Sequence, residues 1–259
     1  MPIHPTAIVD ESCEISAEAG VGPYCIVGPN TRIGAGSVLD AHVCVHGWTT
    51  IGERCHFHSH CSIGTDPQDL KYKGEPTYLK IGNDNVFREF VSLNRGTRGG
   101  HGITVIGSHN FVMAYSHVAH DCVVGDHVIM ANAATLAGHV AIGDHATIGA
   151  FSAVHQFCRV GLHAFIGGFS VITRDALPFI KTVGVRNQAK IYGINTIGLQ
   201  RKGVSEQGIG ELKRVYRMAF RSRMNTGDAL AKIKEQPWSA PEVTALIEFM
   251  ESSERGFIR

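Results

Sequence analysis

Residues 124–148 read VGDHVIMANAATLAGHVAIGDHATI, and an aliphatic residue or methionine recurs at every sixth position of this stretch. The same period runs over twelve hexads from Ile106 to Ile172 and, in an earlier frame, over eleven from Ile3 to Ile63. Three more such residues fall between the two runs, at Ile81, Phe87 and Leu93. A period of six fits neither an α-helix nor the simple alternation of a half-buried strand. The pattern predicts a hexapeptide solenoid.

Each hexad is expected to form a short strand and a corner, so that three hexads complete one triangular coil of about 18 residues. The apolar residue of each hexad points inward. The residue two positions before it also points inward, and it must be small because the interior is narrow. Six of the seven cysteines occupy this second position: Cys13, Cys25, Cys55, Cys61, Cys122 and Cys158. We interpret them as core residues and not as disulfides, metal ligands or nucleophiles.

Two stretches interrupt the period, residues 65–80 and 95–104, and both are predicted to leave the rod as loops. Binding residues tend to lie on loops of this kind. The sequence therefore predicts a mainly β chain, with a parallel β-helix over 1–190 that carries loop excursions at 65–80 and 95–104, and with a C-terminal helical domain over 191–259.

Three helices are predicted in that C-terminal domain. Helical spacing of apolar residues covers Val204–Arg221, and a second helix is expected at about 227–236. The third is expected at Val243–Met250, preceded by a capping box at Ser239–Glu242.

The composition, 44% hydrophobic and 18% charged with a net charge of +1, is ordinary for a globular protein. No apolar run reaches the roughly 18 residues of a membrane helix, and the N-terminus lacks the features of a signal peptide. We therefore predict a cytoplasmic protein without an integral membrane segment. Residues 181–259 hold 14 Lys/Arg against 8 Asp/Glu, which indicates either a solvated helical surface or a surface that attracts an acidic partner.

Residues 18 apart in an unbroken run must lie on neighbouring coils, and this places several polar residues on one edge of the rod. The edge gathers His117, His120, Asp121, Gly138, His139, His155 and Gln156. An imidazole can act as a general base near neutral pH, and an adjacent carboxylate can hold its tautomer. The amide of a glycine on the next coil can stabilise an oxyanion. This combination is typical of acyl transfer to a hydroxyl or an amine.

The histidines also allow two interpretations other than an acyltransferase site. A zinc site or a purely structural solenoid is the main alternative to an enzyme, but His117 and His120 lie on either side of the inward Val118, which makes joint ligation of one metal awkward. We expect no metal there. Four further histidines each lie three positions after an inward residue and receive no predicted role: His109, His127, His145 and His163.

Several strings of the sequence resemble one family of hexapeptide acyltransferases. They are Gln68–Tyr72, Gly74–Thr77, Asn94–Thr97, His117–Cys122, Asn132–Val140, His155–Phe157 and Arg255–Arg259. These strings are similar to those of the acyl-[acyl carrier protein]–UDP-N-acetylglucosamine O-acyltransferases of lipid A biosynthesis, and the similarity covers essentially the whole chain.

The resemblance implies a left-handed β-helix, a homotrimer with active sites between subunits, and transfer of an (R)-3-hydroxyacyl group from acyl carrier protein to the 3-OH of UDP-GlcNAc. It implies His120 as general base, Asp121 as the residue that orients it, and Gly138 as oxyanion donor. Substrate contacts are implied at Asp69, Lys71, His117, His139, Gln156, Asn195 and Arg201. Gly168 matches the position that sets acyl length, where glycine leaves room for a longer chain.

No cofactor is implied, because the acyl thioester is already activated. The acidic carrier protein fits the basic C-terminal part, notably Arg217, Arg221 and Arg223, and no nucleic-acid partner is expected. The chain departs from residues common in the family at Asn94, Ile197 and Lys202. Some members acylate a 3-amino sugar to form an amide, and this acceptor stays open. The related N-acyltransferases carry an extra N-terminal domain, whereas the repeats here begin at Ile3.

Overall fold

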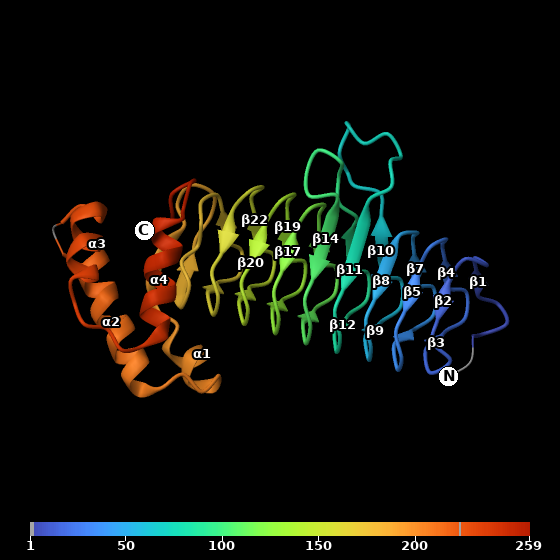
Figure 1. The fold of residues 1–259 in the computed structure, drawn as a ribbon, viewed down its shortest axis with the longest axis horizontal. Helices are drawn as coiled ribbons and strands as arrows, with labels where there is room; N and C mark the ends of the chain where they lie inside the picture. The colour runs from blue at the N-terminus through green and yellow to red at the C-terminus, as the bar shows by residue number, and fades with distance from the viewer. Residues whose placement is uncertain (1–2, 223) are drawn as a thin grey trace.

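The computed structural model describes residues 3–222 and 224–259, and they form a rod with helices at its C-terminal end (Figure 1). Three parallel sheets make the sides of the rod. Side I consists of β1 (Ile8–Val9), β4 (Ile26–Val27), β7 (Cys44–Val45), β10 (Ser62–Thr65), β13 (Ser92–Asn94), β16 (His117–Val118), β19 (Thr135–Leu136), β22 (Ala153–Val154) and β25 (Val171–Ile172).

Sides II and III complete the triangular cross-section. Side II consists of β2 (Glu14–Ile15), β5 (Arg32–Ile33), β8 (Thr49–Ile51), β11 (Tyr78–Ile81), β14 (Ile103–Ile106), β17 (Val123–Val124), β20 (Ala141–Ile142) and β23 (Arg159–Val160). Side III consists of β3 (Gly20–Val21), β6 (Val38–Leu39), β9 (His56–Phe57), β12 (Val86–Phe87), β15 (Phe111–Val112), β18 (Ile129–Met130), β21 (Thr147–Ile148), β24 (Phe165–Ile166), β26 (Ile180–Val183) and β27 (Lys190–Ile194).

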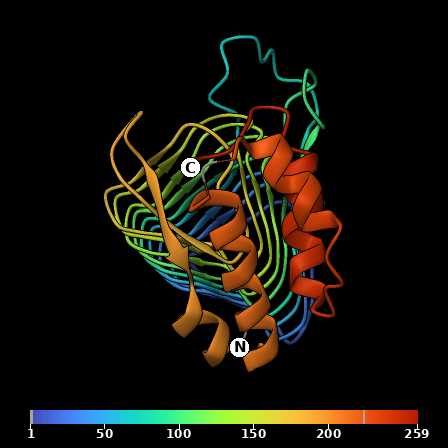
Figure 2. The same cartoon turned by 90° about the vertical axis from the view of Figure 1, so that its left-hand side faces the viewer.

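The register between coils is the one that the period predicts. His117 of β16 pairs with Thr135 of β19, which lies 18 positions later, and the two strands run parallel. Seen along the rod axis, the coils superpose as one outline behind the C-terminal helices (Figure 2). Strands that stack in this way hydrogen-bond from coil to coil, as in any parallel sheet.

The corners of the rod depend on residues in the left-handed backbone region. The third residue after an inward one has φ between +53° and +69° at nearly every corner, although most of these residues are not glycine. Such a conformation costs about 1–2 kcal/mol for a residue with a Cβ. Hydrogen bonds between coils offset this cost, as where the amide of His139 donates to the carbonyl of His120 at 3.0 Å.

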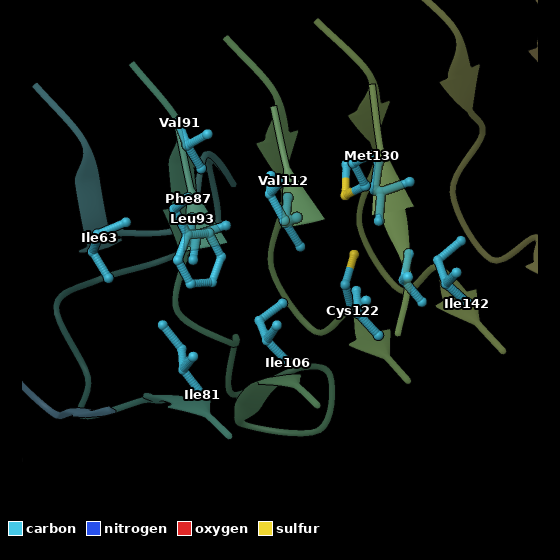
Figure 3. Packing of buried hydrophobic residues seen from close by; sticks show 14 of the residues in the cluster. Ile63, Ile81, Phe87, Val91, Leu93, Ile106, Val112, Cys122, Met130 and Ile142 are labelled. Carbon is cyan, nitrogen blue, oxygen red and sulfur yellow. The ribbon is translucent and has the colours of Figure 1, made fainter. Parts of the chain in front are cut away.

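The interior of the rod is filled as the period predicts. The hexad residues of both runs from Val21 onward are buried, and Phe57 stacks on Phe87 with ring centroids 4.7 Å apart. Figure 3 shows the inward side chains of neighbouring coils in contact, Cys122 among them. All seven cysteines are free, and burial raises the pKa of Cys61 and of Cys122 to about 12. The interpretation of the inward cysteines as core residues is confirmed.

Both interruptions of the period are loops, and both leave the corner between sides I and II. One connects β10 to β11 and the other connects β13 to β14, and Figure 1 shows them rising from the same edge of the rod. The buried Arg95 joins them, because its guanidinium bonds Asp66 and donates to the hydroxyl of Tyr72 at 3.1 Å. We call residues 65–80 the first excursion and residues 95–104 the second excursion.

The C-terminal part adds an antiparallel strand and four helices to the end of the rod. β27 pairs with β26, and the helices are α1 (Thr196–Arg201), α2 (Glu206–Phe220), α3 (Thr226–Lys234) and α4 (Pro241–Glu251). The three predicted helices are confirmed within a few residues, whereas the short α1 is not predicted. The division of the chain at residue 190 stays a prediction. No helix of the described part is long and apolar enough to cross a membrane.

The predicted capping box before the last helix is wrong. The residue that caps α4 is Ala240, with Pro241 as the first helical residue, and no side chain caps the helix. The hydroxyl of Ser239 instead donates to Glu211 of α2 at 2.7 Å. The Ser239 hydroxyl, which the local sequence pattern assigns to capping α4, therefore bonds a residue of another helix instead. Arg223, predicted to meet the carrier protein, lies outside the described residues.

Candidate active site

His120 and Asp121 lie at the corner between sides I and II, directly after β16. Nδ1 of His120 is 2.9 Å from Oδ2 of Asp121. The imidazole is 16% exposed and the carboxylate is fully buried, so solvent can reach the ring but not the group behind it. A carboxylate at Nδ1 fixes the tautomer that leaves Nε2 free to accept a proton. The Asp121 carboxylate therefore holds the imidazole in one orientation and leaves its Nε2 available to accept a proton.

The second excursion encloses the carboxylate of Asp121. The amide of Thr97 donates to both of its oxygens at 3.1 Å, the Thr97 hydroxyl donates at 2.6 Å, and the His101 amide donates at 2.8 Å. Burial alone would raise the pKa of Asp121, but these bonds and the one to His120 outweigh it and hold that pKa below its usual value. Asp121 is therefore an ionised, fixed partner for the imidazole.

The backbone around the pair also depends on glycine. A Cβ at Gly100 would lie 2.4 Å from the carboxyl carbon of Asp121, so the second excursion can close over this carboxylate only with glycine there. The hydroxyl of Thr104, at the end of the excursion, accepts from the amide of Asp121 at 2.8 Å.

The neighbouring coils place Gly138 and His139 where the 18-residue period predicts them. A Cβ at Gly138 would come within 2.6 Å of Cε1 and 2.8 Å of Nε2 of His120, so the glycine backbone lies directly against the reactive edge of the imidazole. His139 is edge-on to His120, with ring centroids 5.2 Å apart, and its other side stacks on Phe157 at 4.4 Å.

Burial and nearby charged groups shift the pKa of His139. Burial lowers the pKa of His139, and His120 and His101 lower it further, while Asp121 and Asp69 act in the opposite direction. Asp69 belongs to the first excursion, which leaves the rod at the same corner, between sides I and II, as His120. The pocket next to His139 is lined by the second excursion, corner residues and the chain end, including His101, Phe157 and Arg255.

Other predicted substrate residues differ in how closely they approach His120. His117 precedes it on β16, where burial lowers the pKa of its imidazole and its Nδ1 lies 2.8 Å from the hydroxyl of Ser92. Gln156 is exposed on the coil beyond Gly138, and its backbone carbonyl oxygen lies 3.2 Å from Nδ1 of His155. Lys71 is exposed on the first excursion, two residues after Asp69.

Three predicted residues lie on other parts of the chain. Asn195 is the residue directly before α1. Its side chain does not cap the helix, and the side-chain amide donates instead to the carbonyl of His163 at the corner between sides II and III. Arg201 is exposed at the end of α1. Gly168 is exposed at the corner between sides III and I. Within one chain, these three residues do not share the corner of His120.

Three residues of the site receive no predicted role from the sequence. Thr97 ends the string Asn94–Thr97 that carries the resemblance, and His101 and Thr104 lie where the period stops and spacing no longer fixes position. Phe157 follows Gln156 in the string His155–Phe157, so the sequence predicts that it lies near the site. Its stacking on the ring of His139 is known only from the structure.

The four histidines without a predicted role form a column at the corner between sides II and III. The ring centroids of His109, His127, His145 and His163 are 4.6–4.7 Å apart from one coil to the next. Burial, with contributions from His145 and Lys202, lowers the pKa of His163 to about 4. The column is a stack of rings along this corner, away from His120.

Comparisons with known proteins identify the family of the chain. Residues 103–138 match the family of bacterial transferase hexapeptides, and residues 175–258 match the second domain of UDP N-acetylglucosamine O-acyltransferases. Curated acyl-[acyl-carrier-protein]–UDP-N-acetylglucosamine O-acyltransferases of Thermodesulfovibrio yellowstonii and Syntrophobacter fumaroxidans are each 49% identical to the chain, over 99% and 100% of both partners. The chain belongs to the acyl-[acyl-carrier-protein]–UDP-N-acetylglucosamine O-acyltransferase family.

Solved structures of this acyltransferase family extend the match to the whole fold. The LpxA of Acinetobacter baumannii is 46% identical with a TM-score of 0.95 over 99% of both chains. That of Moraxella catarrhalis is 45% identical with a TM-score of 0.96 over 100% of both. The predicted fold class, a left-handed parallel β-helix with a helical C-terminal part, is confirmed, and so is the prediction that the chain is an acyltransferase.

Proposed function

We propose that this acyltransferase moves an (R)-3-hydroxyacyl group from acyl carrier protein to the 3-OH of UDP-GlcNAc, the first step of lipid A biosynthesis. The observation that carries the proposal is the buried Asp121 carboxylate, which holds Nδ1 of His120 at 2.9 Å beside the Gly138 backbone. Relatives at 49% identity are named for the same donor and acceptor.

In this mechanism His120 is the general base and Asp121 is its positioning residue. Nε2 of His120 takes the proton of the sugar hydroxyl while the oxygen attacks the thioester carbonyl, and the Gly138 amide donates to the resulting oxyanion. When the intermediate collapses, the carbon–sulfur bond breaks and the imidazolium returns the proton to the leaving thiolate. The thioester supplies the activation, so the reaction requires no cofactor.

The sugar nucleotide would be held by residues on both sides of His120. We assign contacts with the sugar and phosphates to Asp69, Lys71, His117, His139 and Gln156. The first excursion, which carries Asp69 and Lys71, leaves the rod at the corner of His120, and this supports the assignment. Gly168 is assigned to the acyl chain, because its exposed backbone leaves open space that a larger side chain would fill.

We further propose a homotrimer in which Asn195 and Arg201 of one subunit reach the His120 corner of the next. Two observations support this. The predicted site residues occupy different corners of one chain, and side II exposes apolar side chains along its outer face, with Val123 42% exposed between the half-buried Val105 and Ala141.

A mixing experiment tests the shared site. His120→Ala and Arg201→Ala chains are co-expressed with different tags, and mixed trimers are isolated. In a cyclic trimer that contains both variants, one of the three interfaces has both residues intact, so about a third of wild-type activity should return. Mixed trimers that stay as inactive as either parent would overturn the shared site.

The acyl carrier protein would approach the basic C-terminal part, where Arg217 and Arg221 lie at the end of α2. A cytoplasmic location is proposed on the free state of all seven cysteines, which is typical of a reducing compartment.

The decisive assay for the reaction offers the purified enzyme 3-hydroxyacyl carrier proteins of several chain lengths, with UDP-GlcNAc or its 3-amino analogue as acceptor. Transfer to the 3-OH supports the proposal, and exclusive formation of an amide would replace it by N-acylation. No transfer to either acceptor would contradict both.

A further inference from the structure

We propose that Asp40, His56 and His58 form a binding site for one divalent transition metal, of the zinc class, on the outer face of side III. We call these three residues the Asp40 cluster. It lies on a different side of the rod from the His120 corner, and none of its residues has a role in the mechanism proposed above.

The coil geometry brings the three side chains together. His56 and His58 flank the inward Phe57, which is fully buried, so both imidazoles leave the same outer face of the rod. Asp40 lies 18 positions before His58 and hence on the adjacent coil, where its amide donates to the carbonyl of Phe57 at 2.9 Å. Two ligands on one strand and a third from its neighbour are held by the rigid ladder between coils.

The distances fit a single metal ion. Oδ1 of Asp40 is 3.1 Å from Nε2 of His56, and its Oδ2 is 3.2 Å from Nδ1 of His58. One donor atom from each of the three residues lies within 4.8 Å of the others. Zinc bonds of about 2.0–2.2 Å in a tetrahedral site separate the ligand atoms by about 3.3–3.5 Å. Small side-chain rotations would therefore be enough to bind the ion.

The surroundings leave the site open to solvent and select the kind of ion. The side chains of His56, Asp40 and His58 are 40%, 34% and 24% exposed, so an ion can enter directly. Two imidazoles and one carboxylate suit Zn²⁺ or Co²⁺ better than Mg²⁺ or Ca²⁺, which prefer all-oxygen sites. Water would complete the coordination.

One charged pair borders the Asp40 cluster. Oε1 of Glu89 is 4.0 Å from Nδ1 of His58, but both carboxylate oxygens of Glu89 bond the guanidinium of Arg88 at 3.0 and 3.1 Å. Glu89 thus offsets the positive charge of Arg88 next to the ion, and it becomes a fourth ligand only if this pair opens.

The same distances would also suit a carboxylate that simply bonds two imidazoles, so the test must measure metal directly. The tag-free enzyme, stripped with a chelator, is titrated with Zn²⁺ by calorimetry and with Co²⁺ by visible absorption. A His139→Gln background removes one imidazole of the other group of potential ligands, formed by His120, Asp121 and His139. We expect one Zn²⁺ per chain, with Co²⁺ bands of four- or five-coordination.

Variants assign the ion to the Asp40 cluster. His58→Gln and Asp40→Asn should each weaken Zn²⁺ binding at least about tenfold, and Zn²⁺ should raise the Tm of the parent but not of these variants. His60→Gln is the matched control, because that ring belongs to an aromatic column with His42 and Phe90 instead. Unchanged Zn²⁺ affinity in both cluster variants, or no saturable binding by the parent, would overturn the proposal.

Discussion

Gly138→Ala tests how tightly the site confines the catalytic imidazole. The added Cβ would lie 2.6 Å from Cε1, 2.8 Å from Nε2 and 3.2 Å from Nδ1 of His120, whereas carbon atoms in contact prefer about 3.5–4.0 Å. The ring must therefore move by about 1 Å. It cannot move freely, because Nδ1 is held 2.9 Å from the buried Asp121 carboxylate. A misplacement of about 1 Å can cost 10²-fold in rate, and we expect a loss of kcat of this size.

The assay is the initial rate of acyl transfer at saturating UDP-GlcNAc, with Tm measured in parallel. Gly210→Ala is the control, because its Cβ would meet nothing within 4 Å and lies in helix α2. This control should keep wild-type kcat and gain up to about 1 kcal/mol of stability from helix propensity. A Gly138→Ala enzyme with wild-type kcat and an unchanged Tm would refute the reasoning, since the ring would then have room that the structure denies it.

Three further substitutions test the site from other directions. Asp121→Asn should lower kcat by about 10²–10⁴-fold, because the amide can donate to Nδ1 and leave the proton on Nε2. Because the pKa of Asp121 is lowered in the folded state, its ionised carboxylate stabilises the fold at pH values above the unfolded pKa of about 3.9, and this stabilisation is lost as pH falls through the folded pKa. The difference in unfolding free energy between wild type and Asp121→Asn, measured with urea, should therefore become smaller in acid. A difference that does not change with pH would contradict this. Thr97→Val removes the 2.6 Å hydroxyl bond to Asp121 and should lower kcat about tenfold, whereas wild-type kcat would show that this bond does not position the base. Cys122→Ala should keep kcat within about threefold and cost about 1 kcal/mol of unfolding free energy, because a buried thiol with a pKa of about 12 is not a nucleophile; a hundredfold loss would reverse that interpretation.

The sequence predicts the rod and the His120 column because both follow from strict periodicity. Once three hexads close a coil, the neighbours of His120 on the next coils are Gly138 and then Gln156, and the structure confirms the contact with Gly138. The inward cysteines follow from the same rule, since their slot can hold only small side chains.

The residues that sequence reasoning misses lie where no period applies. Thr97 and His101 belong to the second excursion, and their bonds to Asp121 depend on a loop path that only the packed structure defines. The cap expected of Ser239 fails for a similar reason, because the hydroxyl finds Glu211 on α2, a partner 28 positions away. Local signals are overruled wherever a distant partner competes for the same polar atom.

Single-turnover kinetics of His120→Ala test whether His120 is the general base of acyl transfer. The enzyme is mixed in excess with labelled 3-hydroxyacyl carrier protein and UDP-GlcNAc, and the rate of product formation is followed. His109→Ala, in the column at the other corner, serves as the control. We expect a rate at least about 10²-fold below wild type for His120→Ala and near wild type for His109→Ala. Wild-type single-turnover rates in a correctly folded His120→Ala enzyme would contradict it.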